Sequence, residues 1–409
     1  MRALLEESFR AAVAAADPLQ ILAPHIPPQP KGRTFVAAAG KAAASMAAAL
    51  EKHFKGELDG IAITRYGHGL PTSRIRVIEA GHPVPDEAGE AAARQILERT
   101  EQLGSEDLLL ALLSGGGSSL LSLPAADIPM ADLKAVTQQL LRSGAAIQEM
   151  NTVRKHLSAI HGGRLAAASR APVLALIISD VTGDDPTHIA SGPCAPDPTT
   201  YADALEILGR YRVAPPASIK ERLEKGAEET PKPGDAVFAK VQNKVIATAH
   251  RSLEAAAEVF RKQGVTPVIL GDTVTGEAAE VAKVMAALVY EIRKYKTPWK
   301  PPVALVSGGE CTVTLRGEGG RGGRCTEFLL SLGIETGGVW AIAADTDGID
   351  GSEDNAGAVL TPESMRSALR AKELLARNDS YGFFSALGDL VVTGPTRTNV
   401  NDYRAIVVD

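Results

Sequence analysis

The segment best suited to bind a phosphate is Ser114-Gly115-Gly116-Gly117-Ser118-Ser119, which follows an aliphatic run at 108–113 and precedes a helical pattern. Three glycines allow the backbone to approach a ligand closely, and the N-terminal end of a helix offers unpaired N–H groups and a positive dipole end to an anion. A tight strand-to-helix turn with no ligand would need the same glycines, so a structural role is the alternative. The similar segment Ser307-Gly308-Gly309-Glu310 follows a second aliphatic run. We therefore expect two such loops, one per domain, with a ligand held between the domains.

Three cations lie next to glycine-containing turns. Lys41 follows the run 34–39 and Gly40, but a Walker A loop would need glycine in place of Phe35 and Ser or Thr in place of Ala42. Lys41 could still neutralise a phosphoryl group in transfer, or be an ordinary exposed lysine at the start of a helix. Arg321 and Arg324 lie in the segment GEGGRGGRCTEF. Their guanidinium groups suit phosphate or carboxylate, with a solvated surface loop as the alternative.

Two clusters of acidic residues follow apolar strands. Asp180 comes after the run 173–178, and Asp345 comes after the run 340–344. Carboxylates at strand ends can hold Mg²⁺, which prefers oxygen ligands and often bridges to phosphates. Aspartates among glycines are also common turn and N-cap residues, which explains several of the neighbouring acids. We select Asp180 and Asp345 as the candidate metal ligands.

Two other kinds of enzyme compete with a phosphate-transferring one. Residues 317–322 match the dinucleotide-binding pattern GxGxxG, and Asp345 stands where a ribose-binding acid would be expected. The pattern is weak alone, and Arg321 and Arg324 would crowd the packing of its helix on the strand. A hydrolase would use Ser118 or Ser119, but no GxSxG elbow is present.

These residues need a scaffold of strands that end in loops at one edge of a sheet. Near-continuous aliphatic strands alternate with Ala-rich helical patterns, which predicts parallel sheets buried on both faces. The polar, proline-flanked stretch 214–236 predicts a domain boundary near 231–235, and a strand at 244–249 is expected to open the second domain. We predict an α/β protein of two α/β domains, 1–232 and 235–409. The first is Rossmann-like with a mostly parallel sheet.

The bulk composition agrees with this class. The chain has 409 residues, 45% of them apolar and 4% aromatic, with a net charge of −6. The acidic balance argues against nucleic acid as the main partner. Three cysteines without CxxC spacing fit a reducing, cytoplasmic setting. The N-terminal segment is interrupted by Glu6, Glu7 and Arg10 and is expected to be an amphipathic helix, and no run is long enough to span a membrane, so no membrane partner is expected.

Taken together, the motifs resemble those of the glycerate 2-kinases that have an N-terminal glycerate-kinase domain and a C-terminal MOFRL domain, some of whose members are labelled hydroxypyruvate reductase. The resemblance covers essentially the whole chain. The matching segments, in order, are AAAGKAAASMA (37–47), AGHPVPDE (80–87), LLSGGGSSLL (112–121), NTVRKHLSAIHGGRLA (151–166), ISDVTGDDPTHIASGPCAPDPTT (178–200), SGGECTVTL (307–315), GGRGGRCTEF (319–328), AADTDGIDG (343–351) and TGPTRTNVNDY (393–403).

The resemblance implies transfer of the ATP γ-phosphate to the C2 hydroxyl of D-glycerate, with Mg²⁺, at a site in the interdomain cleft. It assigns Lys41 and Arg324 to the handling of phosphate and substrate, and we add Asp180 as the candidate base. Loop 114–119 is then expected to bind the nucleotide phosphates, and loop 307–310 the substrate. After Arg324 the family often has Asn-Gln, where this chain has Cys325-Thr326. An NAD(P)-dependent hydroxypyruvate reductase stays the alternative, and the resemblance leaves open whether copies assemble.

Overall fold

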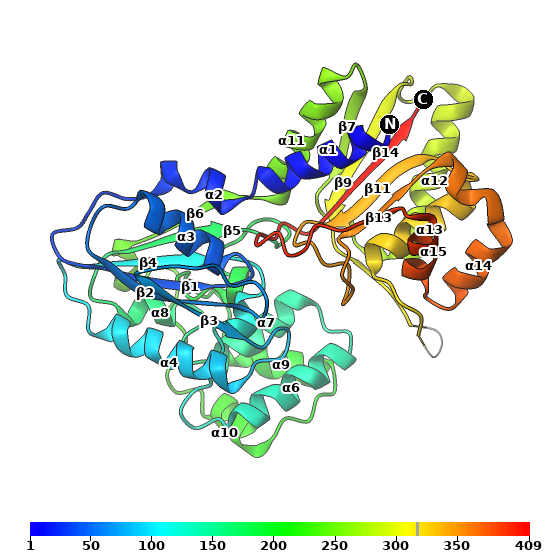
Figure 1. The fold of residues 1–409 in the computed structure, drawn as a ribbon. Helices are drawn as coiled ribbons and strands as arrows, with labels where there is room; N and C mark the ends of the chain where they lie inside the picture. Colours follow the sequence, from blue (N-terminus) through cyan, green and yellow to red (C-terminus); the bar gives the residue numbers. More distant parts are fainter. Residues whose placement is uncertain (316–318) are drawn as a thin grey trace. The chain divides into compact units, whose positions relative to one another are not determined.

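The computed structural model describes residues 1–315 and 319–409. By their contacts the residues form two compact units. The larger unit is Pro18–Ile246, and the other combines Met1–Asp17 with Ala247–Asp409. Figure 1 draws the chain coloured along the sequence. The predicted domains 1–232 and 235–409 stay a prediction. In the structure, the N-terminal helix groups with the C-terminal part of the chain.

The unit Pro18–Ile246 is built on a six-stranded sheet in the order β3-β2-β1-β4-β5-β6. The pairs β3–β2, β2–β1, β1–β4 and β4–β5 are parallel, and this order is that of the dinucleotide-binding α/β fold. The strands are β1 (Thr34–Ala39), β2 (Leu58–Arg65), β3 (Ile75–Ala80), β4 (Leu108–Leu113), β5 (Val173–Ile178) and β6 (Val241–Ala247). The prediction of a Rossmann-like N-terminal sheet is confirmed.

Helices cover both faces of this sheet, as Figure 1 shows for α3 and α4. A separate helical layer packs around its own apolar core, which includes Val136, Val153 and Ile207. The helices of the unit are α2 (Pro18–Ile21), α3 (Ala43–His53), α4 (Glu87–Glu101), α5 (Gly117–Leu120), α6 (Met130–Arg142), α7 (Ile147–His156), α8 (Arg164–Ala168), α9 (Tyr201–Arg210) and α10 (Ala217–Lys225), with short 3₁₀ turns η1 (Ala23–His25), η2 (Ile189–Ser191) and η3 (Ala236–Lys240).

The second unit has a mixed six-stranded sheet in the order β13-β12-β11-β14-β9-β7. Its strands are β7 (Thr266–Gly271), β9 (Val303–Gly309), β11 (Trp340–Asp345), β12 (Gly357–Leu360), β13 (Leu390–Val391) and β14 (Asp402–Val408), and β8 (Gly276–Glu277) pairs apart from them with β10 (Cys311–Thr312). In this six-stranded sheet the β7–β9 pair is parallel, and the other four neighbouring pairs are antiparallel.

Helices also cover both faces of the second sheet, because its strands alternate their apolar side chains between two cores. Val303 and Leu305 join one core, whereas Ala304 and Val306 join the other with Phe9 of the N-terminal helix. The helices are α1 (Arg2–Ala14), α11 (Ala249–Lys262), α12 (Ala278–Tyr295), α13 (Arg324–Thr336), α14 (Ala368–Ala376) and α15 (Ser380–Leu387), with the 3₁₀ turn η4 (Pro362–Ser367).

Two local predictions are wrong. The strand expected at 244–249 was assigned to the second domain, but β6 (Val241–Ala247) completes the first sheet next to β5. Ser307, Gly308 and Gly309 were expected to form a loop before a helix. They are the last residues of β9 and pair with β14, where Gly309 faces Asp402, and β10 rather than a helix follows them.

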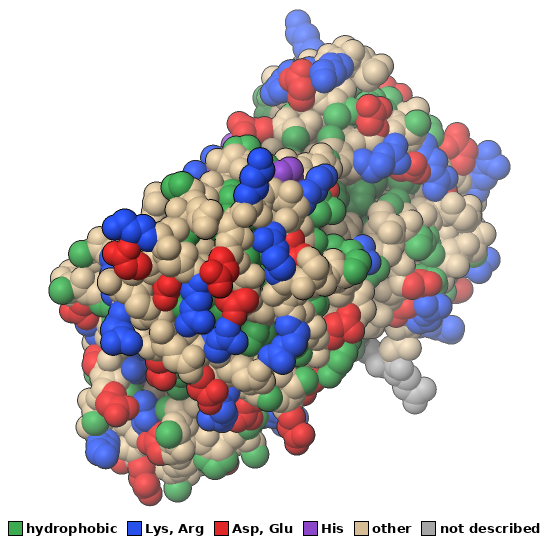
Figure 2. Space-filling model, turned by 60° about the vertical axis from the view of Figure 1, so that its left-hand side comes forward, with side chains coloured by type: hydrophobic (Ala, Val, Ile, Leu, Met, Phe, Trp, Pro, Cys, Tyr) green, Lys and Arg blue, Asp and Glu red, His purple; other side chains and the backbone are tan. Residues whose placement is uncertain are grey.

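The surface charge is mixed. On the face that Figure 2 shows, lysine and arginine side chains are interspersed with aspartate and glutamate, so this face carries no continuous basic patch. Across residues 1–315 and 319–409, no helix is both long and apolar enough to cross a bilayer.

Candidate functional site

The first candidate site lies where the strand order of the parallel sheet reverses. β1 and β4 are neighbours, with Ala39 paired to Leu113. The next strand after β1, β2, lies on one side of this pair, and the next strand after β4, β5, lies on the other. In open α/β sheets, ligands bind in the crevice at the carboxyl ends of the strands at such a switch point. Lys41 follows β1 and the loop 114–119 follows β4. The two segments selected from sequence therefore meet here.

Gly40 and Ser114 hold the two strand ends together. The N–H of Lys41 donates to Gly115 O (2.8 Å), and the N–H of Ala42 donates to Ser114 Oγ (3.0 Å). Gly40 has φ +128°, and a Cβ there would lie 2.2 Å from Ser114 Oγ. Only glycine can fill this position without displacing Ser114. The close approach of the two backbones thus requires the glycine at position 40.

The glycine loop itself differs from the expected helix N-terminus. α5 (Gly117–Leu120) is a single turn of four residues. The argument from a helix dipole therefore fails for this loop. What the loop offers instead is backbone at close range and the hydroxyls of Ser118 and Ser119.

Lys41 and His82 surround the centre of the loop. Gly116 has φ +81°, and a Cβ built on it would lie 2.9 Å from His82 Nε2 and 3.4 Å from Lys41 Cγ. The Lys41 side chain is half-buried. A ligand lying on Gly116 would thus be next to the Lys41 side chain and the His82 imidazole, neither of which belongs to the loop.

A second chain segment supports the loop from 190–192. Ser191 Oγ donates to Ser118 Oγ (2.8 Å) and lies 3.2 Å from Asn151 Oδ1 on α7. Ala190, Ser191 and Gly192 all have positive φ, at 50°, 57° and 59°. Non-glycine residues held in this region cost free energy and cluster at functional sites. Asn151 and Ser191 were missed from sequence, although both lie inside the family-like motifs.

Asp180 follows the next strand of the same sheet. β5 pairs with β4, Ile177 lies opposite Leu113, and Asp180 comes two residues after the strand ends. It is half-buried. The structure therefore places Lys41, the loop 114–119 and Asp180 after three neighbouring parallel strands at one edge of the sheet.

The second candidate site lies in the other unit, around Arg324 at the first turn of α13. Arg324 Nε donates to Asp402 Oδ1 (2.7 Å), and its Nη2 donates to Asp345 Oδ2 (2.7 Å). Its Nη1 lies 3.0 Å from Glu310 Oε1. Burial alone would lower the pKa of Arg324, but the charges of Asp402, Asp345 and Glu310 outweigh it and raise the pKa well above the usual value. Arg324 is a permanent cation.

A second arginine completes this cluster. Arg404 is buried, donates to Asp402 Oδ2 (2.7 Å) and to Gly308 O (3.1 Å), and was not selected from sequence. Arg321 points elsewhere: it pairs with Glu353 (2.6 Å) and stacks on the ring of Tyr381. Arg324 therefore belongs to a charge network and Arg321 to a surface contact. The first two residues of the GxGxxG match fall within 316–318, outside the described residues, and the match follows the two-residue strand β10.

The oxygen donors fit magnesium only in part. Among the residues that the structure describes, no three His, Cys, Asp or Glu side chains gather into a group able to hold a metal ion alone. Asp345 Oδ2 is engaged by Arg324, and its Oδ1 accepts the N–H of Asp347 (3.0 Å). Mg²⁺ in kinases takes one or two carboxylates and is otherwise held by substrate phosphates and water. Asp180 and Asp345 stay predicted metal ligands.

Comparison with known proteins shows which family the chain belongs to. Residues 4–224 match a family model described as a domain of unknown function, DUF4147, and residues 303–402 match the MOFRL family. The chain is 41% identical to a "Glycerate 2-kinase" of Pyrococcus horikoshii (92% of this chain, 88% of that protein) and 37% identical to a "D-glycerate 2-kinase" of Thermotoga maritima (98% and 97%). It is 50% identical to an Agrobacterium vitis protein named "Putative hydroxypyruvate reductase" (100% and 94%).

A solved structure, that of the glycerate kinase of Thermotoga maritima, matches over the full length of this chain and 99% of its own, with a TM-score of 0.89 at 36% identity. The fold and the paired family domains define an α/β protein of the DUF4147–MOFRL type. The chain belongs to the glycerate 2-kinase family.

Proposed function

We propose that this protein transfers the γ-phosphoryl group of ATP to the C2 hydroxyl of D-glycerate, giving 2-phosphoglycerate and ADP. The observation that carries the proposal is the meeting of Lys41 and the loop 114–119 at the switch point of the parallel sheet, in a chain whose relatives include glycerate 2-kinases. Phosphoryl transfer depends on positioning and on stabilisation of negative charge, which a glycine loop and fixed cations supply.

Under this proposal, the loop 114–119, Lys41, Arg324 and Asp180 each have a role in the reaction. The loop 114–119 binds the phosphates of ATP, Lys41 neutralises the transferring group, and Arg324 binds an oxyanion with Glu310 beside it. Asp180 accepts the proton of the C2 hydroxyl as its oxygen attacks phosphorus. The bond from the γ-phosphorus to the β,γ-bridging oxygen breaks, and ADP leaves. A bound Mg²⁺, with Asp180 or Asp345 among its ligands, would offset charge on the β- and γ-phosphate oxygens.

The direct test is incubation of the purified protein with ATP, MgCl₂ and D-glycerate, followed by NMR identification of the phosphoglycerate isomer. ADP should form only when both D-glycerate and Mg²⁺ are present. Lys41→Ala should lower turnover by about 10²–10³-fold, because one preorganised electrostatic partner is lost. Lys31→Ala, which removes an 85% exposed lysine of the same unit, is the matched control and should keep full turnover. Formation of 3-phosphoglycerate, or equal turnover in both variants, would contradict the proposal.

A hydroxypyruvate reductase is the second candidate, because the Agrobacterium vitis relative carries that name and the strand order is one that binds dinucleotides. The first strand-to-helix turn disfavours it. That turn reads Ala39-Gly40-Lys41-Ala42 and lacks the GxGxxG spacing that lets a pyrophosphate approach the helix. Oxidation of NADH or NADPH by hydroxypyruvate, without ATP-dependent turnover, would favour the reductase. ATP binding without turnover on any hydroxy acid would indicate a nucleotide sensor.

A further inference from the structure

A cavity of about 70 Å³ opens beside the glycine loop within the unit Pro18–Ile246. The apolar lining comes from the segment after β3 and from Leu133 and Leu141 of α6, a helix that also contributes Lys134. The loop 114–119, α7 and the segment after it supply further polar groups. Ser118, Ser119, Arg154 and His161 line the cavity, together with Pro83 and Leu133 on its apolar side. This volume exceeds the ~10–15 Å³ that one water molecule needs.

Arg154 brings a positive charge to this cavity that the protein does not neutralise. Its Nη1 lies 3.3 Å from Asn151 Oδ1, a neutral amide. Within the described part of the chain, Arg154 has no carboxylate at ion-pair distance, whereas the neighbouring Lys155 has Asp197 at 3.3 Å. Burial lowers the pKa of Arg154, so its charge costs stability in the folded protein. Arg154 is half-buried, and a cation in this position without an anion is explained if a ligand supplies the anion.

His161 gives the same cavity a second unused polar group. It is 3% exposed, and its Nε2 has no hydrogen-bond partner in the described residues. Burial, with the charges of Arg154 and Lys155, lowers the pKa of His161 to about 3. The ring is therefore neutral at neutral pH and offers one hydrogen bond at Nε2 without adding charge.

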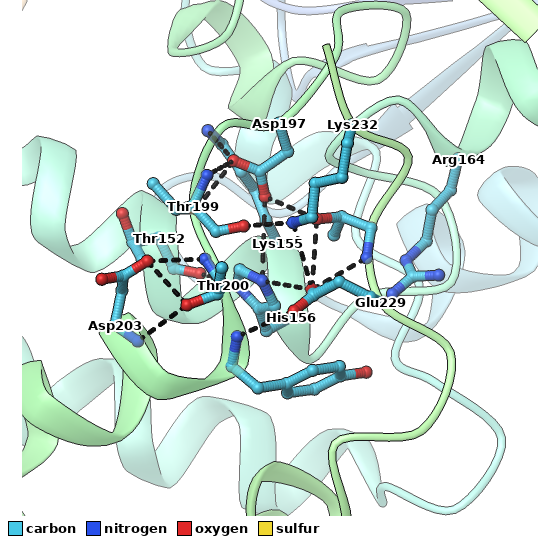
Figure 3. A network of polar contacts seen from close by, with 12 residues as sticks. Thr152, Lys155, His156, Arg164, Asp197, Thr199, Thr200, Asp203, Glu229 and Lys232 are labelled. Atoms are coloured by element: carbon cyan, nitrogen blue, oxygen red, sulfur yellow. Dashed lines mark hydrogen bonds and ion pairs between the residues drawn. The ribbon is translucent and has the colours of Figure 1, made fainter. Parts of the chain in front are cut away.

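A partly buried polar network holds the two residues that follow Arg154 on α7, and Figure 3 draws it. Lys155 Nζ pairs with Asp197 Oδ1 (3.3 Å), and His156 Nε2 lies 2.9 Å from Glu229 Oε1. Successive residues on an α-helix point about 100° apart. Lys155 and His156 thus anchor the end of α7, and Arg154 projects away from them toward the cavity.

We propose that Arg154 binds an oxyanion of one of the two substrates, with Ser118 and Ser119 beside it and His161 Nε2 as an additional hydrogen-bonding group. The oxyanion is either a nucleotide phosphate or the carboxylate of the hydroxy acid, since both have the planar or tetrahedral oxygen edge that a guanidinium fork fits. This role rests on the proposed kinase function but can be measured without turnover.

The test measures binding and melting temperature in four proteins: the wild type, Arg154→Met, Arg154→Lys and the control Arg94→Gln. Arg94 is an exposed residue of α4 in the same unit. ADP and D-glycerate are titrated separately by calorimetry, each with MgCl₂. Arg154→Met should weaken one ligand by about 10–100-fold, because a charge-assisted hydrogen bond is lost. Arg154→Lys should recover only part of this, and Arg94→Gln should match the wild type.

The ligand that weakens identifies the source of the oxyanion: ADP for a nucleotide phosphate, D-glycerate for a carboxylate. The melting temperature of Arg154→Met should stay equal or rise, because no ion pair is broken and a desolvated charge is removed. Unchanged affinity for both ligands, or an affinity loss matched by a lower melting temperature, would overturn the inference. A wild type that binds ADP through Arg154 but forms no phosphoglycerate would contradict the kinase proposal and leave this one standing.

Discussion

The guanidinium of Arg324 and the carboxylate of Asp345 form an ion pair of 2.7 Å between α13 and the end of β11. Asp402, the first residue of β14, pairs through Oδ1 with Nε of the same guanidinium. Its other oxygen, Oδ2, pairs with Arg404. Arg324 is therefore held at two points by buried carboxylates, with its third nitrogen toward the exposed Glu310. Under the proposed function, an oxyanion would meet Arg324 at this third nitrogen in place of Glu310.

Arg324→Lys should separate the role of Arg324 in turnover from its role in folding. A lysine keeps the charge near Asp345 and Asp402 but cannot reproduce the fork. We expect turnover to fall by about 10²-fold with a small change in melting temperature. Arg324→Ala should also lose about 3–5 kcal/mol of stability, because buried carboxylates lose their partner. Steady-state kinetics and thermal melts check both, with Arg321→Lys as the control. If Arg324→Lys keeps wild-type turnover, the guanidinium group of Arg324 has no role in the reaction.

Gly116→Ala tests the close approach at the glycine loop. The added Cβ would lie 2.9 Å from His82 Nε2, in a backbone conformation with φ +81°. Gly144→Ala is a matched control, because φ there is +74° and nothing lies within 4 Å of the new Cβ. Both substitutions should lower the free energy of unfolding by ~1–2 kcal/mol, because alanine is strained in the left-handed conformation. Only Gly116→Ala should also weaken ADP by ten-fold or more in a calorimetric titration. Equal ADP affinity in both folded variants would move the phosphate site elsewhere.

The structure could be predicted from the sequence where the residues of a segment alone determine its conformation. The aliphatic runs at 34–39, 108–113 and 173–178 became the central strands β1, β4 and β5, because such runs satisfy a sheet buried on both faces. Prediction from the sequence failed where pairing with a distant segment determines the conformation. Ser307–Gly309 resembles a loop by composition but becomes strand by pairing with β14, and β6 joins the first sheet through β5.

The site residues show the same limit. Lys41 and the loop 114–119 could be selected because glycine and lysine follow apolar runs. Arg154 could not be selected from the sequence, because the adjacent Lys155 is an equally good candidate cation there. Only the fold shows that Lys155 has Asp197 as a partner and that Arg154 has an amide and a cavity instead.

The Lys155–Asp197 pair should contribute to stability rather than to chemistry. Both side chains are almost fully buried, and Asp197 also accepts from Thr199 and Thr230. Asp197→Asn leaves the Lys155 ammonium buried without a counter-charge, so we expect a loss of about 3–5 kcal/mol in a urea titration. Glu206→Gln, which breaks an exposed pair with Arg210, should cost no more than about 1 kcal/mol. A loss in Asp197→Asn as small as that of the control would show that the buried pair is not stabilising.

The pKa of His161 predicts a loss of stability in mild acid. Its folded-state value of about 3 lies below the unfolded value of 6.5, and the charges that face it, Arg154 and Lys155, stay positive throughout this range. Between these two pH values the unfolded chain holds a proton at His161 that the folded chain does not. Stability is therefore complete above pH 6.5 and falls as the pH drops below it.

Between pH 6.5 and 5.5 this one group should lower the free energy of unfolding by about 1 kcal/mol, from a slope of ~1.4 kcal/mol per pH unit at full effect. Urea titrations at the two pH values measure it. His161→Gln keeps a hydrogen-bonding side chain without the titration, so its pH dependence should be smaller by that amount. His53→Gln removes an exposed histidine of α3 and should behave as the wild type. Equal pH dependence in His161→Gln and the wild type would mean that folding does not lower the pKa of His161.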